Sequence, residues 1–244
     1  MYPWSVTLYR KSPLSFSLIW IGIYCLGNSL AGPMSAAALA VNIGLSAVLF
    51  LWIKKQGLLK FYGLCKPTMP ASRFLWYIPL LLFVSSNLWG GFADELSPLD
   101  VLCHIFNMLC VGFLEEVIFR GLLFRAMAKD NVRSAIIVSS VTFGIGHILN
   151  LFNGSGMELV ANLCQVVGAI VCGFLFVVLF YRGGSLMPCI IAHGVNNAVT
   201  IFGRQTKYDI LITAITLVIA GIYTLILLRT LPKPTENTTT ESPI

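Results

Sequence analysis

The chain has 244 residues, of which 57% are hydrophobic and 11% are charged, and its formal net charge is +6. A soluble domain carries about 45–50% apolar and roughly 25% charged residues, and a globule of this size needs a polar surface that so few charges cannot provide. The composition excludes a soluble enzyme, a disordered protein and a secreted disulfide scaffold, and it indicates an integral membrane protein. The positive charge is interpreted as a topological signal and not as a nucleic-acid surface.

A membrane-spanning helix needs roughly 20 mostly apolar residues. Runs of this kind predict about eight spans, which in chain order are 14–31, 34–53, 74–92, 99–124, 134–152, 159–180, 185–203 and 210–228. The first run also resembles a signal peptide, but its length and the spans that follow favour a transmembrane helix. We expect an all-α polytopic membrane bundle with one transmembrane domain over residues 1–231, and a disordered tail rich in Pro, Thr and Glu over 232–244.

The distribution of basic residues predicts the orientation of this bundle. With eight spans, thirteen of the sixteen basic residues fall on the side that holds both chain ends, and only Arg204 and Lys207 fall on the opposite side. Lysine and arginine gather in cytoplasmic loops of membrane proteins. We therefore expect both termini to be cytoplasmic and the protein to lie in the cell membrane. The seven cysteines contain no CxxC pair and are interpreted as small buried hydrophobic residues.

Three charged residues stand inside the predicted fourth span, and each costs about 2.5–3.5 kcal/mol at mid-membrane on an insertion scale. Glu116 and Arg120 are four residues apart, so they can pair on one face of a helix. Glu115 is rotated by about 100° from Glu116 and must find a different environment. An ion pair that fixes helix packing explains Glu116 with Arg120 but not Glu115, which suits a general base.

Two further spans carry imidazole and amide side chains. The predicted fifth span contains Phe143 and, one turn later, His147, while the seventh contains His193 and Asn197 on one face. Either histidine can be a hydrogen-bonding group between helices, and Asn196 could serve that purpose as well as Asn197. Gly144 and Gly146 are expected to let another helix approach closely, and His104, at the far-side start of the fourth span, is expected at the membrane interface.

Two kinds of chemistry remain open for these groups. Glu115, His147 and His193 could bind a metal ion such as zinc, although no HExxH helix supports a zinc site. Alternatively, Glu115 and His147 could take a proton from water while His193 and Asn197 stabilise a tetrahedral oxyanion. No cofactor is favoured, and zinc is the possible exception.

The three motifs together resemble the CPBP family, the CAAX-protease and bacteriocin-processing (Abi) intramembrane endopeptidases. The family pattern of Glu-Glu-x-x-x-Arg, Phe-x-x-x-His and His-x-x-x-Asn is met by Glu115 to Arg120, by Phe143 to His147 and by His193 to Asn197, on separate spans within a motif core of 99–203. The resemblance implies that Glu115 and His147 activate water, that His193 and Asn197 form the oxyanion site, and that Glu116, Arg120 and Phe143 support them.

The expected function is therefore a multi-pass membrane protease that hydrolyses a peptide bond close to the bilayer. Its substrate would be a membrane-associated peptide or protein: a CAAX-like tail, a bacteriocin or signalling-peptide leader, or another membrane protein. Two alternatives stay open. A family member can act as a non-proteolytic scaffold or regulator, and a small proton-coupled transporter could use the same ionisable groups, although no inverted repeat supports a transporter.

Overall fold

The computed structural model describes residues 4–32, 35–94 and 96–233, and within these ranges the chain is helical apart from loops and one isolated bridge between Phe92 and Gly203. The α-helices are α1 (Trp4–Lys11), α2 (Pro13–Ala31), α3 (Ala36–Lys55), α4 (Ile78–Ser85), α5 (Pro98–Glu115), α6 (Arg125–Ala128), α7 (Val132–Gly146), α8 (Leu159–Gly183), α9 (Met187–Val199) and α10 (Asp209–Thr230). A π-helical segment, η3 (Glu116–Phe124), joins α5 to α6. Four short 3-10 segments complete the described helices: Ala71–Tyr77, Ser86–Leu88, His147–Leu151 and Thr200–Phe202.

The expected all-α membrane bundle is confirmed. Within the described residues, six helices are long and apolar enough to cross a membrane, and they correspond to the first, second, fourth, fifth, sixth and eighth predicted spans. The fourth is a single run over Pro98–Ala128, made of α5, η3 and α6. The orientation of the termini stays a prediction. Of the tail predicted over 232–244, only Pro232 and Lys233 fall within the described residues.

Two predicted spans are less regular than expected. In place of a helix over 74–92, the chain forms the 3-10 segment Ala71–Tyr77, the short helix α4 and the 3-10 turn Ser86–Leu88. Leu75, Trp76 and Tyr77 have positive φ angles of 50°, 54° and 57°, and α4 begins only after this left-handed stretch. The predicted span 185–203 is likewise shorter, since α9 covers 13 residues before a 3-10 turn.

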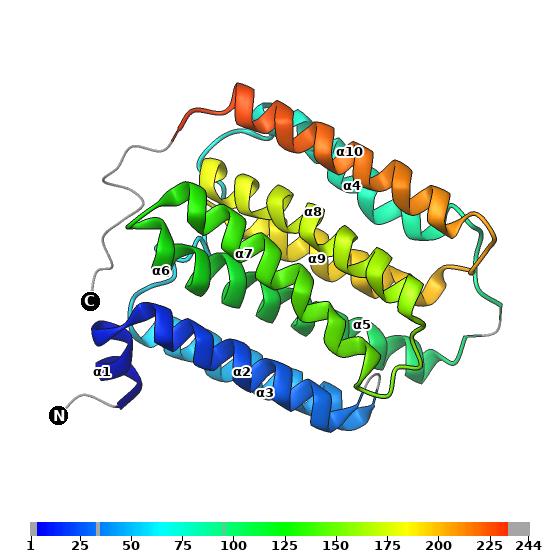
Figure 1. Ribbon diagram of the computed structural model, residues 1–244, viewed down its shortest axis with the longest axis horizontal. Helices are drawn as coiled ribbons and strands as arrows, with labels where there is room; N and C mark the ends of the chain where they lie inside the picture. Colours follow the sequence, from blue (N-terminus) through cyan, green and yellow to red (C-terminus); the bar gives the residue numbers. More distant parts are fainter. Residues whose placement is uncertain (1–3, 33–34, 95, 234–244) are drawn as a thin grey trace.

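Several basic residues of the described chain gather at one end of the bundle. There Arg73 donates to the Thr230 carbonyl and Arg182 to the Leu231 carbonyl, so the loop before α4 and the ends of α8 and α10 lie together. The helix α1, which no apolar run predicted, ends in Arg10 and Lys11 at the same end (Figure 1). We call this region the basic end and the opposite region the far end.

Helix packing places α5 and α8 in the middle of the molecule. The helix α5 packs against α3 and α9, while α8 packs against α7 and α10. The pair α2 and α3 flanks this centre on one side, and α4 with α10 flanks it on the other (Figure 1). Of the helices that carry the sequence motifs, α5 is itself central, and α7 and α9 each pack directly on a central helix.

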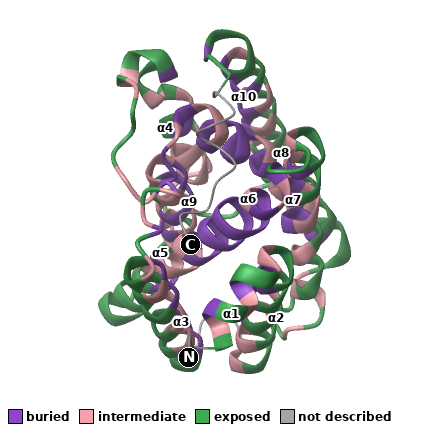
Figure 2. Cartoon of the chain, turned by 90° about the vertical axis from the view of Figure 1, so that its left-hand side faces the viewer, coloured by how far each residue is buried: buried purple, intermediate pink, exposed green. Residues whose placement is uncertain are grey.

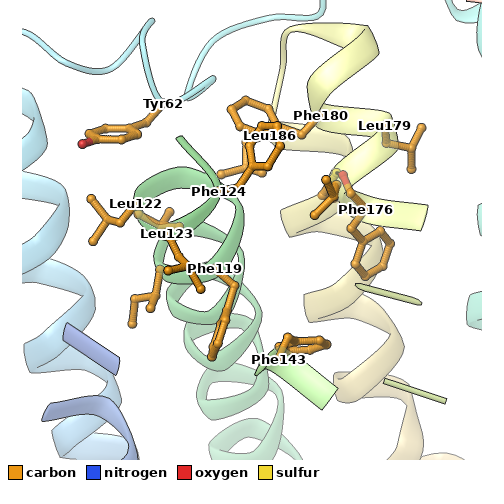
Figure 3. Packing of buried hydrophobic residues seen from close by; sticks show 14 of the residues in the cluster. Tyr62, Phe119, Leu122, Leu123, Phe124, Phe143, Phe176, Leu179, Phe180 and Leu186 are labelled. Carbon is orange, nitrogen blue, oxygen red and sulfur yellow. Dashed lines mark hydrogen bonds between the residues drawn. The ribbon is translucent and has the colours of Figure 1, made fainter. Parts of the chain in front are cut away.

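The most enclosed part of the chain is η3, in which all nine residues are buried (Figure 2). Its apolar side chains face the aromatic residues of neighbouring helices (Figure 3). The ring of Phe119 lies 5.3 Å from that of Phe143 on α7, and the ring of Phe124 lies 6.1 Å from that of Phe180 on α8. π-Helices are rare in proteins, and those that occur are often found at functional sites. This one begins at Glu116.

Candidate active site

A close crossing of α5 and α9 positions the first two ionisable groups. A Cβ atom at Gly112 would lie 2.6 Å from the Cα atom of Gly194, so this contact accepts glycine alone without a shift of the backbone. Glu115 is one turn beyond Gly112, and His193 directly precedes Gly194. The crossing therefore brings Glu115 and His193 together, and both side chains are buried.

His193 lies between the two glutamates. Its Nε2 atom is 3.3 Å from Oε2 of Glu115, and its Nδ1 atom is 2.8 Å from Oε1 of Glu116. The Nδ1 contact is a hydrogen bond that a neutral imidazole can donate, whereas the Nε2 contact is a longer approach between the ring and the second carboxyl group. A buried carboxylate–imidazole–carboxylate array of this kind can store and transfer protons.

Arg120 compensates the charge of Glu116 inside the bundle. Its Nη1 atom is 3.1 Å from Oε1 of Glu116, which confirms the predicted pairing at i and i+4, and both side chains are fully buried. The guanidinium carbon lies 4.0 Å from the centre of the Phe143 ring, in cation–π geometry. Phe143 thus contacts the site directly, as the second motif suggested, by covering its positive charge.

Glu115 has a further partner that the sequence did not reveal. The hydroxyl of Tyr24, on α2, donates a hydrogen bond of 2.9 Å to Oε1 of Glu115, and both residues are buried. Tyr24 and Glu115 are 91 positions apart in the chain, and no sequence pattern links two helices over that distance. Glu115 is therefore held from two sides, by Tyr24 on one oxygen and by His193 on the other.

His147 belongs to the same cluster of rings but does not contact Glu115. Its ring centre is 5.0 Å from that of Phe143, which in turn is 5.8 Å from that of His193. The Nδ1 atom is 3.1 Å from the Phe143 carbonyl oxygen, which can only accept, so Nδ1 carries the proton and Nε2 is left as an acceptor. Gly144 allows the close approach that was expected, since its Cβ would lie 2.9 Å from the backbone nitrogen of Ile170, whereas Gly146 has no neighbour within 4 Å.

Asn197 lies further along α9, towards the far end. Its Oδ1 atom accepts a hydrogen bond of 3.4 Å from Asn196, and its carbonyl oxygen accepts one of 3.1 Å from Nε2 of His104. His104 is only 7% exposed, so its ring does not project from the bundle into the surroundings, and its expected position at the level of the membrane interface stays a prediction. The imidazole is enclosed between α5 and α9, where it fixes the backbone that presents Asn197.

A ladder of amide side chains ties α2 and α3 to α5 on the far-end side of Tyr24. The side-chain amide of Asn42 donates hydrogen bonds of 2.8 Å to Oδ1 of Asn107 and of 3.0 Å to Oδ1 of Asn28. The amide of Asn28 donates a hydrogen bond of 3.1 Å to Oδ1 of Asn42. Asn42 and Asn107 are buried. Polar groups between membrane helices are satisfied by one another, and this ladder fixes the position of the helix that carries Tyr24.

The structure does not assemble the zinc ligands that the sequence left open. Over the ranges described, no group of three or more histidine, cysteine, aspartate or glutamate side chains has the arrangement to hold a metal ion. His147 makes no contact with Glu115 or His193 that would complete such a set. These residues therefore do not fit a zinc centre in this conformation.

The fold and the site define a class of protein: a multi-pass helical membrane protein that encloses a buried cluster of two glutamates, a histidine and an arginine between its central helices. A family model described as "Type II CAAX prenyl endopeptidase Rce1-like" matches residues 97–199. The match includes all three motifs and covers less than half of the chain, and this segment is similar to the CPBP, or CAAX-protease, family. Neither the curated proteins nor the solved structures contain a significant match to the chain. The apolar helices and this similarity together support an integral membrane protein, and the similarity suggests a hydrolase of the intramembrane protease class.

Proposed function

We propose that the protein is an intramembrane endopeptidase that hydrolyses a peptide bond in a membrane-associated peptide or protein. The observation that carries the proposal is the buried Glu115 carboxylate, held between the Tyr24 hydroxyl and the His193 imidazole. A carboxylate placed by two partners in a water-poor site is suited to remove a proton from a water molecule. The family match supports peptide-bond hydrolysis as the reaction class.

In this proposal, one protonation state of the cluster is reactive. His193 is a cation that donates from Nδ1 to Glu116, and Glu115 is an anion. Glu115 takes a proton from water, and the hydroxide adds to the carbonyl carbon of the substrate. Nε2 of His193 then donates to the oxyanion, in place of its 3.3 Å contact with Glu115. The proton held by Glu115 passes to the leaving nitrogen as the carbon–nitrogen bond breaks, which yields a carboxylic acid and an amine and returns Glu115 to its anionic form; the acid then gives its proton to the amine or to water.

The roles proposed for Asn197 and His147 are those that the sequence motifs suggest. Asn197 is proposed as a second donor to the oxyanion, from its side-chain amide. His147, with Nε2 as an acceptor, is proposed to orient the water or relay its proton together with Glu115. The substrates in view are a CAAX-like prenylated tail, a bacteriocin or signalling-peptide leader, and another membrane protein, and the cell membrane is the proposed location.

The proposal is tested with Glu115→Gln in proteoliposomes, using a farnesylated CAAX peptide and a panel of leader peptides with product detection by mass spectrometry. We expect the rate to fall by about 10²–10⁴-fold, because the change preserves shape but removes the base. Glu158→Gln is the matched control, since Glu158 is exposed before α8, and it should retain the wild-type rate.

Three outcomes would count against the proposal. Hydrolysis by the Glu115→Gln variant at the wild-type rate would exclude Glu115 as the base. Activity that a strong chelator abolishes and zinc restores would contradict the metal-free chemistry. A wild-type protein that binds these peptides but cleaves none, with Glu115→Gln binding equally well, would favour the non-proteolytic scaffold.

A further inference from the structure

A groove opens at the basic end, between the start of α2 and the turn that follows α6. It consists of two adjoining cavities of about 320 and 240 Å³, and both are lined by Lys11, Pro13, Ala126 and Lys129. We call these joined cavities the basic groove. Along the helix that carries Glu115, its lining begins at Leu122, about two helical turns beyond Glu115, and no lining residue belongs to the candidate active site. Figure 2 looks onto this end of the molecule.

The charges that line the basic groove are mostly positive. Arg10, Lys11, Arg125 and Lys129 contribute four basic side chains, and Asp130 is the acidic one among the lining residues. Neither Lys11 nor Lys129 forms an ion pair with any residue that the structure describes. Two such lysines on opposite walls of one cavity favour an anion between them.

The inner wall of the groove consists of packed aromatic side chains and the Arg125 cation. The Arg125 guanidinium lies over two rings, 5.2 Å from the centre of Phe61 and 4.8 Å from that of Phe180. Tyr62 donates a hydrogen bond of 2.9 Å to Tyr9. Burial, with a smaller contribution from Tyr9, raises the pKa of the Tyr62 phenol well above its ordinary value, so Tyr62 adds no negative charge to this wall at neutral pH.

An apolar strip leads away from the groove along the outside of α2. Leu14 lines the larger cavity and is 41% exposed, and Leu18, one turn later on the same face, is 53% exposed. On a membrane-spanning helix, such residues face lipid chains. The groove therefore accepts an anionic group, and the adjoining surface accepts a hydrocarbon chain, which are the two parts of an anionic lipid.

We propose that the basic groove binds the phosphate headgroup of an anionic membrane lipid, with an acyl chain along Leu14 and Leu18. A headgroup in this position contacts both α1–α2 and the end of the helix Pro98–Ala128. It therefore bridges the helix that carries Tyr24 and the helix that carries Glu115. The binding itself does not depend on whether the protein is a protease.

The experiment measures retained lipid by native mass spectrometry after reconstitution in nanodiscs of phosphatidylcholine with phosphatidylglycerol. The double variant Lys11→Gln with Lys129→Gln should bind phosphatidylglycerol about 30-fold more weakly, because each of the two lysines contributes about 1 kcal/mol towards an anionic lipid and a tenfold change is about 1.4 kcal/mol. The matched control is Lys54→Gln with Lys55→Gln, which removes the same charge from exposed lysines at the end of α3 and should change the affinity by less than about twofold.

Further arms separate the possible sources of binding. Inorganic phosphate at millimolar concentration should not displace the lipid, and displacement by phosphate would mean a free-anion site instead. An equal loss in the groove variant and in the control would attribute binding to the general charge of the basic end, and would overturn the proposal. Retention of wild-type binding by a folded groove variant, or by Lys129→Glu alone, would overturn it as well.

Discussion

Two arginine–carboxylate pairs lie in opposite surroundings within this molecule. Arg120 and Glu116 pair inside the bundle with side chains that are 0% exposed, whereas Arg204 and Asp94 pair at the far end with side chains that are 53% and 76% exposed. Water screens the second pair but not the first. Only the buried pair needs further partners, and it finds them in His193 and the Phe143 ring.

The difference between the two pairs shows which charges of a membrane protein carry information about function. An exposed pair can form wherever two loops meet, as the loop before α5 and the loop after α9 do here. A buried pair is retained against a desolvation cost of several kcal/mol per ion, so its position is specified by the fold. Breaking each pair, and the contacts around the buried one, tests this difference, and the largest effect is expected at Arg120.

Arg120→Met should cost about 3–5 kcal/mol of stability, because it leaves the Glu116 carboxylate buried without its cation. The measurement is the free energy of unfolding in mixed micelles, from an SDS titration. Adding Glu116→Gln to this variant should recover part of the loss, since the amide oxygen still accepts from His193 and the buried charge is gone. A loss below about 1 kcal/mol for Arg120→Met alone would contradict the importance of burial.

Gly112→Ala should destabilise the protein by about 1–3 kcal/mol, as overpacking in a tight contact does, and should lower hydrolysis. The added methyl group would meet the backbone of Gly194 at 2.6 Å and separate Glu115 from His193. Thermal unfolding and peptide cleavage measure the two effects. Gly221→Ala on α10 is the control, because it has no neighbour within 4 Å and should be neutral or stabilising. Normal cleavage by Gly112→Ala would show that the crossing does not set the site.

Tyr24→Phe should reduce kcat about tenfold while KM changes little, because a hydrogen bond to a charged group is worth about 1.5–3 kcal/mol and His193 still holds Glu115. Steady-state kinetics separate the two constants. Tyr208→Phe serves as the control, since Tyr208 is exposed at the far end. An unchanged kcat would remove Tyr24 from the site, whereas a change in KM alone would assign it to substrate binding.

The sequence predicted those features that depend on one helix alone. Long apolar runs located six spans to within a few residues at most ends, and spacing along one helix predicted that Arg120 pairs with Glu116. The third predicted span failed because composition does not report the left-handed backbone at 75–77. The helix α1 was missed because eight residues with a polar end do not resemble a span.

Contacts between helices were beyond the reach of the sequence. The partners of His193 depend on where α5 crosses α9, and the contact of Tyr24 with Glu115 depends on the placement of α2. Periodicity describes one helix and is silent about its neighbours. The motifs named the residues for which a catalytic role is proposed, but they could not show that the Phe143 ring lies between His147 and His193. That arrangement leaves its proposed part in catalysis to experiment.

Arg204→Gln should lower the free energy of unfolding by no more than about 0.5–1 kcal/mol, because exposed ion pairs are weak. Asp94→Asn should have an equally small effect, and both should shrink further in about 1 M salt, where the Debye length is about 3 Å. The contact between the two loops remains in both variants, because the backbone N–H of Arg204 donates a hydrogen bond of 3.0 Å to the Gly91 carbonyl oxygen and does not involve the side chain. A loss as large as that of Arg120→Met would mean that the far-end pair is specified as strongly as the buried one. Burial could then no longer be used to separate the charges that build the candidate site from those that only join two loops.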